Sequence, residues 1–265
     1  MGIGAQSTPL RKTLFRAFSS IYVRRKVRTA DGVFEAFLSP GSSLKVLKPS
    51  VELDQVHKRF IRDWIRSDTV VWDIGLNLGL FALPAALKAN RGHVYGFEPD
   101  VDLIVNILRS LRLATNKRLN VSAYCIAISD EDGTASFQIS KFSRAMSKLE
   151  AVGKWHDHQV ATEELRPVVT VRVDTLARTI PPPTAMKIDV EGAEMNVLTG
   201  AIETIAKHRP AILIEGPNEI WDEMGKFFRQ RDYLLFDGAS DRPVPLEHPV
   251  WDTFAIPREK FMAAG

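Results

Sequence analysis

The chain has 265 residues, 45% of them hydrophobic and 25% charged, which is the composition of an ordinary globular protein. It contains no apolar run near the ~20 residues that a membrane-spanning helix requires. The single cysteine, Cys125, excludes an internal disulfide and lies in an apolar stretch, which predicts a buried thiol in a reducing compartment and a cytoplasmic protein.

Positive charge is concentrated at the N-terminus. Residues 1–30 hold seven Lys or Arg residues and no Asp or Glu, so removing these seven from the net charge of +3 leaves −4 on the remainder. A mildly acidic body argues against nucleic-acid binding. We expect a basic arm over residues 1–30, in which Leu14, Phe18 and Ile21 share one helical face. That face could contact an anionic membrane surface or a protein partner; a solvated helix or loose arm is the simpler alternative.

Residues 31–69 form a predicted N-terminal extension. Two short strands, VFEAFLS and LKVLKP, flank the turn-forming sequence PGSS. Apolar residues at helical spacing between Val51 and Ile65 then predict a helix before the main domain begins.

From residue 70 onward, short apolar runs alternate with helical patterns. Strands are predicted at 69–75, 93–99 and 121–129, with helices at 80–90 and 101–116 between them. This alternation is typical of a parallel sheet that helices cover on both faces. We therefore treat residues 70–265 as one α/β domain.

The alternation is interrupted between residues 129 and 167. The sequence SDEDGTASFQIS predicts a hairpin around Asp132 and Gly133, and the polar stretch at about 140–167 predicts a lid or substrate loop. The later elements are expected as follows: strands at 184–189 and 211–216, helices at 191–208 and 218–231, and strands at 233–238 and 252–257. The last two strands should pair antiparallel at one edge of the sheet.

Two successive strand ends carry the features of a nucleoside site. Gly75 and Gly79 bracket a tight turn, and Asn77 stands where the dinucleotide fingerprint G-x-G-x-x-G has its middle glycine. That glycine lets the backbone approach a pyrophosphate, so its replacement favours a cofactor without phosphates. Asp73 and Glu98 end the two strands, and Glu98 could accept both hydroxyls of a ribose, of NAD or of another adenosine cofactor. Helix capping would explain either acid alone.

Three carboxylates, Asp189, Glu191 and Glu194, follow the strand that ends near residue 189. Asp189 should lie at the carboxyl end of a central strand, where ligands bind in open parallel sheets. Glu194 falls in the first turn of the next helix, where an acid is favourable on its own, and Glu191 fits either role. A divalent metal would explain clustered oxygens, but no histidine or further acid is close in sequence, and we expect none.

Five motifs in order resemble the FkbM family of S-adenosylmethionine-dependent methyltransferases. They are D-I-G-L-N-L-G, F-E-P, A-I-S-D-x-x-G, V-x-V-D-T-L and K-I-D-V-E-G-A-E, and the similarity runs from about Val70 to Pro257. The resemblance implies a Rossmann-like class I methyltransferase fold, with a mostly parallel seven-stranded sheet, an antiparallel last strand and helices on both faces. It also implies transfer of a methyl group to a hydroxyl, often on a sugar or a polyketide, by in-line displacement.

The resemblance also implies roles for residues. Asp73, Gly75, Asn77 and Gly79 would hold the methionine portion of the cofactor, Glu98 the ribose, and Pro99, Ile126, Ala127 and Ile128 the adenine, although Ile128 also fits a core position. Asp189 would offset the positive charge of the methyl donor and, with Glu191, orient the acceptor hydroxyl or take its proton. Further candidates for acceptor contacts are Trp155, His156 and His158 in the expected lid, and Glu215.

Two other functions remain open at this point. One is an NAD-dependent oxidoreductase on a similar sheet, against which Asn77 and the carboxylates near residue 189 both count, since carboxylates repel phosphates. The other is a module that binds the cofactor without catalysis. The expected partner is a small-molecule or glycan acceptor and not a nucleic acid.

Overall fold

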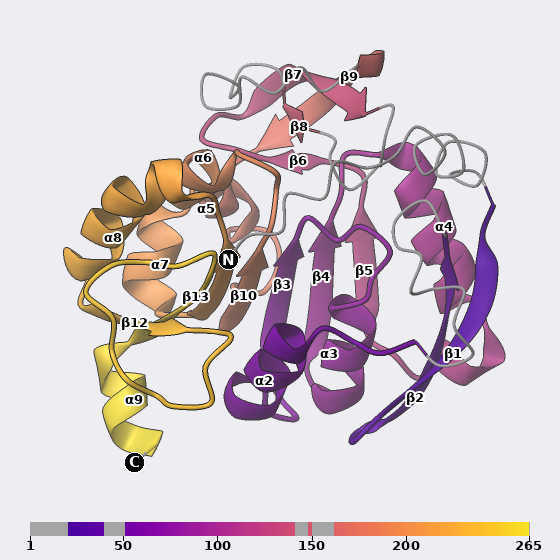
Figure 1. Cartoon of the computed structure of the whole chain (residues 1–265). Coiled ribbons are helices and arrows are strands. Elements are labelled where there is room, and N and C mark those ends of the chain that lie inside the picture. Colours follow the sequence, from indigo (N-terminus) through magenta and orange to yellow (C-terminus); the bar gives the residue numbers. More distant parts are fainter. Residues whose placement is uncertain (1–20, 40–50, 141–147, 150–161, 265) are drawn as a thin grey trace, which may run out of the picture.

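A seven-stranded sheet forms the centre of the computed structural model, which describes residues 21–39, 51–140, 148–149 and 162–264. The strands, in spatial order, are β12 (Tyr233–Asp237), β13 (Asp252–Pro257), β11 (Ala211–Glu215), β10 (Ala185–Ile188), β3 (Val70–Ile74), β4 (His93–Phe97) and β5 (Val121–Tyr124). In this sheet β13 runs antiparallel to both of its neighbours, β12 and β11, and the other pairs of strands are parallel (Figure 1). The predicted α/β fold with an antiparallel last strand is confirmed.

Helices cover both faces of this sheet (Figure 1). One face packs on α2 (Gln55–Trp64), α3 (Ala82–Lys88) and α4 (Val101–Leu111), and the other on α5 (Val173–Leu176), α6 (Glu194–Thr199), α7 (Ile202–His208) and α8 (Trp221–Arg229). Side chains of β3 alternate between the two cores, because Val71 joins the first and Trp72 the second. Short elements complete the order: η2 (Ala114–Asn116), η5 (Asn218–Ile220) and α9 (Arg258–Ala264). Among the described residues, no helix combines the length and apolar character needed to cross a bilayer.

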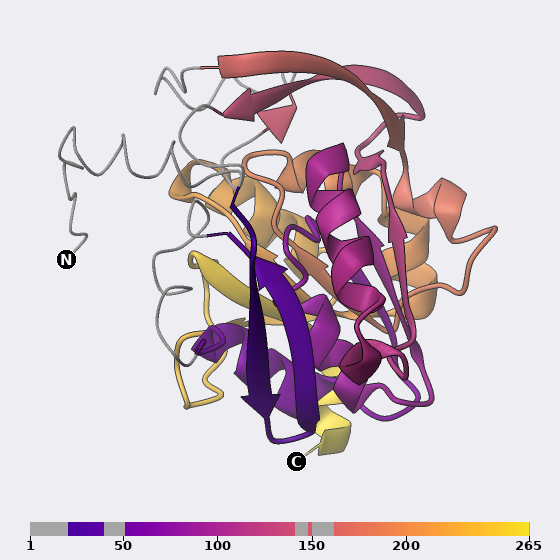
Figure 2. The same cartoon turned by 90° about the vertical axis from the view of Figure 1, so that its right-hand side faces the viewer.

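An antiparallel hairpin precedes the main domain and includes residues 23–29 of the predicted basic arm. Strands β1 (Val23–Thr29) and β2 (Gly32–Leu38) pair along their length, and Figure 2 shows them lying alongside α3 and α4. Asn106 of α4 donates to Phe37 O at 2.6 Å, which secures β2 to the helix. Basic side chains alternate outward along β1, so period-two charge, not a helical face, governs this segment.

The predicted boundary between residues 30 and 31 falls in the turn of this hairpin. Ile21 is 46% exposed, while Leu14, Phe18 and the expected strand LKVLKP lie outside the described residues. The predicted helix after Val51 is confirmed as α2, whose start is capped by Asp54.

A second, four-stranded sheet covers the carboxyl ends of β3, β4 and β5, at the top of Figure 1. Its strands, in spatial order, are β6 (Ala127–Ile128), β9 (Thr162–Val171), β7 (Gly133–Ser140) and β8 (Lys148–Leu149). The predicted single strand 121–129 is therefore wrong, because the chain leaves the main sheet after Tyr124 and enters the second sheet at Ala127. The connecting Cys125 is exposed, so the predicted buried thiol is also wrong.

The predicted hairpin around Asp132 and Gly133 is wrong as well. Strands β6 and β7 do not pair with each other; both pair with β9, one on each of its edges. Asp132 instead fastens the turn, accepting hydrogen bonds from Arg172 N and Thr175 Oγ1, each at 2.7 Å. Residues 162–167 of the expected lid belong to β9, and residues 141–147 and 150–161 lie outside the described part.

The single helix predicted over 191–208 is divided into α6 and α7. Asp174 accepts hydrogen bonds from Glu203 N and Thr204 N, at 3.1 and 2.8 Å, and so caps a new helix start. At the break, a Cβ on Gly200 would lie 2.1 Å from Ser129 O, so a glycine is needed for this close approach.

Gly200→Ala should destabilise the protein by about 1–3 kcal/mol, because the added Cβ would force the α6–α7 junction away from the chain at Ser129. Gly133→Ala is the matched control, since its nearest neighbour would be Thr170 Oγ1 at 3.9 Å. Urea denaturation followed by circular dichroism measures both. Equal stability of the two variants would contradict this account of the break.

Candidate functional site

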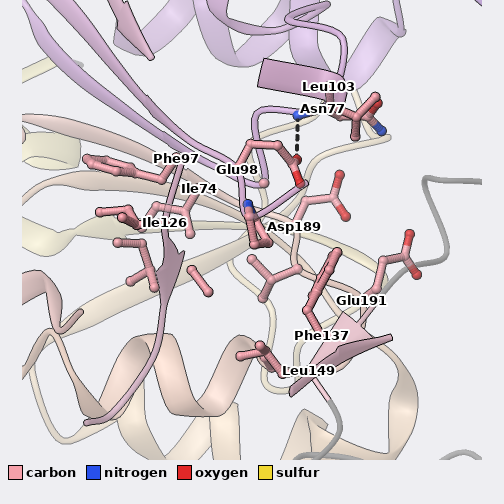
Figure 3. A pocket seen from close by; sticks show the side chains of 16 residues that line it. Ile74, Asn77, Phe97, Glu98, Leu103, Ile126, Phe137, Leu149, Asp189 and Glu191 are labelled. Atoms are coloured by element: carbon pink, nitrogen blue, oxygen red, sulfur yellow. Dashed lines mark hydrogen bonds between the residues drawn. The ribbon is translucent and has the colours of Figure 1, made fainter. Parts of the chain in front are cut away.

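A cavity lies between the carboxyl ends of β3, β4 and β10 and the second sheet (Figure 3). The residues that line it are Ile74, Gly75, Asn77, Phe97, Glu98, Pro99, Leu103, Ile126, Ala127, Ile128, Phe137, Leu149, Asp189, Val190, Glu191 and Ala193. Figure 3 shows Phe137 and Leu149 of the second sheet across from Glu98 and Asn77. The cavity therefore combines one largely apolar wall with carboxylates at the ends of the central strands.

The turn after β3 forms the floor of this cavity. Gly75 and Asn77 have positive φ angles of 86° and 50°. A Cβ on Gly75 would lie 1.8 Å from Asp189 O, so only glycine lets the β3 turn pass this close to the end of β10. The N–H groups of Gly75 and Leu76 both donate to Phe97 O at 3.0 Å, which ties the turn to β4.

Glu98 is held at the end of β4 by two backbone donors. Asn77 N donates to Oε2 at 2.9 Å and Asp100 N to Oε1 at 3.0 Å. The side chain is 6% exposed, and burial raises the pKa of Glu98 to about 7 against these two hydrogen bonds. Each carboxylate oxygen keeps a lone pair for a further donor, so Glu98 can accept hydrogen bonds from a ligand with hydroxyl groups.

Lys187 is a buried cation that sequence reasoning did not assign to the site. Its Nζ lies 2.9 Å from Asp189 Oδ2 and 3.8 Å from Asp73 Oδ1, and the residue is 3% exposed. The carboxylates of Asp189 and Asp73 raise the pKa of Lys187 despite its burial. Asp73 is fully buried and neither of its oxygens has a hydrogen bond; burial raises the pKa of Asp73 to about 6.

The two glutamates after Asp189 are placed differently. Glu191 has a positive φ of 54° and an exposed side chain at the rim of the cavity. Glu194 is 2% exposed and accepts a hydrogen bond from Gly192 N at 2.9 Å, so it supports the start of α6 as predicted. Its Oε2 is buried without a partner.

The cavity brings together most of the residues singled out from the sequence. Those that line it are Gly75, Asn77, Glu98, Pro99, Ile126, Ala127, Ile128, Asp189 and Glu191. Asp73 and Gly79 are buried outside its lining, and Glu215 belongs to the neighbouring strand β11. Trp155, His156 and His158 lie outside the described residues.

Phe137 and Leu149 were missed because they come from the second sheet. Buried Phe137 and Ile139 alternate with Gln138 along β7, and this period of two was the available signal for a covered strand face. Within the described ranges, no three His, Cys, Asp or Glu side chains are grouped to hold a metal ion. The absence of a metal remains a prediction.

Lys187→Met should destabilise the protein by about 3–5 kcal/mol at neutral pH, because it leaves buried carboxylates without their cation. The loss should grow as pH rises above about 6, the value of the Asp73 pKa with Lys187 in place. Without Lys187 that pKa rises further above its unfolded value of 3.8, so the folded variant binds more protons than the unfolded chain and loses stability as pH rises.

Lys88→Met is the matched control, because Lys88 forms a more exposed ion pair with Asp31 at 3.1 Å. Its loss should stay below about 1 kcal/mol. Thermal denaturation from pH 5.5 to 8.5 measures both variants. A small, pH-independent loss in Lys187→Met would contradict the role of this cation.

Comparisons with known proteins assign the chain to a family. The family model of the FkbM methyltransferase domain matches residues 73–235.

The hexuronic acid methyltransferase AglP of Haloferax volcanii is 31% identical to this chain over 144 residues, which are 54% of each chain. The present chain therefore spans about half the length of that relative. Among solved structures, methyltransferase FkbM from Methylobacillus flagellatus KT has 18% identity and a TM-score of 0.47, covering 72% of this chain and 44% of that one. TYW2 of Pyrococcus horikoshii in complex with MeSAdo has 14% identity and a TM-score of 0.45, covering 90% and 73%. The chain belongs to the FkbM methyltransferase family.

Proposed function

We propose that this protein transfers a methyl group from S-adenosylmethionine to a hydroxyl of a sugar or related small molecule. The observation that carries the proposal is the pair of carboxylates in one cavity: Glu98, held by two backbone N–H groups, and Asp189, held by Lys187. Family membership over residues 73–235 supports the reaction class. When bound, the cofactor supplies an electrophilic methyl group on a sulfonium.

The residues that line the cavity fit this cofactor. Glu98 presents the oxygens that ribose hydroxyls require. Pro99, Ile126, Ala127 and Ile128 offer an apolar surface to adenine. The turn at Gly75 and Asn77 suits the methionine end, and the buried Asp73 and Gly79 support this turn from outside the lining.

The charge of the cavity favours S-adenosylmethionine over a nicotinamide dinucleotide as the cofactor. Asp189 lines the cavity, and its negative charge attracts a sulfonium and an ammonium but repels a pyrophosphate. Asn77 also occupies the turn position where a glycine would admit phosphates. A cofactor-binding module without catalysis is disfavoured because Glu98, Asp189 and Glu191 line one cavity, with Asp73 next to Lys187 beneath it.

Asp189 contributes chiefly by positioning. Its Oδ2 accepts from Lys187, which leaves Oδ1 to orient an acceptor hydroxyl while the carboxylate offsets the charge of the methyl donor. Alignment of reacting atoms can supply effective molarities of about 10⁵ M or more, whereas a general base adds roughly 10²–10⁴-fold. Glu191, exposed at the rim, is suited to contacting the acceptor. The sugar class rests on the name of the relative AglP, a hexuronic acid methyltransferase.

S-adenosylhomocysteine, the demethylated product, should raise the melting temperature, and NAD should not. A ligand at 100 times its dissociation constant stabilises by ~2.7 kcal/mol, which a thermal-shift assay resolves. The affinity should weaken as pH falls below about 7, because protonated Glu98 loses acceptor capacity for ribose hydroxyls. Glu98→Gln should bind more weakly and lose this pH dependence. Stabilisation by NAD alone would refute the assignment.

Asp189→Asn should lower kcat by about 10²-fold or more with little change in melting temperature, because the amide keeps a hydrogen-bond acceptor for Lys187 but loses the charge. Transfer of labelled methyl to methyl glucoside and methyl glucuronoside measures turnover. Asp241→Asn is the control, since that residue pairs with Arg59 at the surface. Full activity of Asp189→Asn would remove this residue from the mechanism.

A further inference from the structure

One histidine faces the acidic edge of the sheet from outside the cavity lining. His57 lies on α2, and its Nε2 is 3.2 Å from Glu215 Oε1 at the end of β11. The two side chains are only 16% and 24% exposed. The His57 ring also packs in a T-shaped arrangement with Phe81, just before α3, with ring centroids 5.4 Å apart. The imidazole is therefore held in a defined place between the turn region of β3 and the end of β11.

Strand alternation directs several ionisable side chains to this same face of the sheet. Lys187 lies opposite Asp73 in register, and Glu215 lies opposite Asp252. Leu213 and Phe254, two residues from Glu215 and Asp252, pack in the core that includes α2. Because side chains two residues apart share a face, Glu215 and Asp252 point to the α2 side, where His57 is located.

The pair also lies next to Asp189. Ile188 of β10 is in register with Ile214 of β11, so the following residues, Asp189 and Glu215, are neighbours on adjacent strands. Adjacent strands are about 4.8 Å apart. Glu98 lies on the other side of Asp189, beyond β3. The His57–Glu215 pair thus stands on the side of Asp189 away from the proposed ribose position.

The hydrogen bond determines which nitrogen of the ring is basic. A carboxylate accepts hydrogen bonds and cannot donate them, so Nε2 carries the proton toward Glu215 and Nδ1 keeps its lone pair. Imidazole is the side chain suited to taking a proton near neutral pH. Asp189, by contrast, already accepts from the Lys187 ammonium, and Glu215 is engaged with the ring.

We propose that His57, positioned by Glu215, is the general base that takes the proton of the acceptor hydroxyl. This inference rests on the proposed function. The hydroxyl oxygen forms its new bond to the methyl carbon with its own electron pair, and the pair of the broken carbon–sulfur bond stays on sulfur. The hydroxyl proton passes to Nδ1, and the imidazolium is stabilised by Glu215 until it releases the proton to water.

The charged groups around His57 favour this role. Asp252 on β13 and Asp73 on β3 interact electrostatically with His57. Asp54, which caps α2, interacts with Asp252, and Lys187 on β10 interacts with Glu215. Burial, and then the nearby Glu215, raise the pKa of Asp252 to about 6, which agrees with close packing of these acids.

A general base at His57 has a consequence for the choice of acceptor group. An alcohol must lose its proton as it is methylated, whereas a carboxylate acceptor is already anionic and needs no base. A sugar that offers both groups should therefore be methylated on a hydroxyl, giving an ether, and not on its carboxylate, giving an ester. Methyl glucuronoside contains both groups and distinguishes the outcomes, because mild base hydrolyses the ester only.

The experiment compares the full chain with His57→Gln, Glu215→Gln and Glu215→Asp. The control is His208→Gln. His208 ends α7 just before β11 begins, so it lies near the amino ends of the strands, whereas Glu215 lies at the carboxyl end of β11. Labelled methyl transfer to methyl glucoside and methyl glucuronoside is followed from pH 5.5 to 9. His57→Gln should lower kcat about 10²–10⁴-fold and abolish the rise of kcat with pH at the acid end. Its thermal shift with S-adenosylhomocysteine should equal that of the unaltered protein.

Two readouts separate a base from a structural residue. Glu215→Asp should retain more kcat than Glu215→Gln, because it keeps the anionic partner of the ring. Nitrogen-15 NMR of the histidine rings, without cofactor or acceptor, should find the Nε2–H tautomer at His57, and a mixture of the two tautomers in Glu215→Gln.

Three outcomes would overturn the proposal: unchanged kcat and pH profile in His57→Gln, a base-labile ester as the product, or an Nδ1–H tautomer in the unaltered protein. If S-adenosylhomocysteine binds but neither glycoside is methylated, the proposed sugar acceptor fails and this inference fails with it. If S-adenosylhomocysteine does not bind at all, the proposed function itself is refuted.

Discussion

The ammonium of Lys187 is the charge that lets this sheet keep so many carboxylates at one edge. Three neighbouring strands, β3, β10 and β11, carry Asp73, Asp189 and Glu215 at or just past their carboxyl ends. Burying such groups costs several kcal/mol per ion unless a cation lies among them. Lys187 contacts two of these acids directly and attracts the third. One cation among three acids leaves the edge negative, which suits a positively charged methyl donor.

That arrangement divides the edge into two regions around Asp189. On the β4 side, Glu98 and the apolar residues Ile126 to Ile128 line a cavity suited to a nucleoside. On the β11 side, Glu215 and His57 form a pair suited to moving a proton. The second sheet covers the first region with Phe137 and Leu149, and Arg166 of β9 ties that sheet to the start of α4 through Asp100 at 3.2 Å. Exclusion of water by this cover would strengthen the electrostatic interactions beneath it.

The sequence predicts best what depends on neighbours along the chain. The turn at Gly75 and Asn77, the acid at Glu98 and the carboxylate at Asp189 could all be located because each follows an apolar strand. The break at Gly200 could not, because its causes are Ser129 and Asp174, which are distant in sequence. The same holds for His57, whose partner Glu215 is 158 residues away. Strand β1 within the basic arm could not be recognised for a different reason: basic residues predominate over its weak apolar alternation.

A crystal structure with S-adenosylhomocysteine tests the central claim most directly, because it locates the cofactor against named atoms. The ribose hydroxyls should lie on the Glu98 carboxylate, the adenine beside Ile126 to Ile128, and the sulfur facing Asp189. Ligand density at another surface, or an empty cavity at saturating ligand concentration, would contradict it.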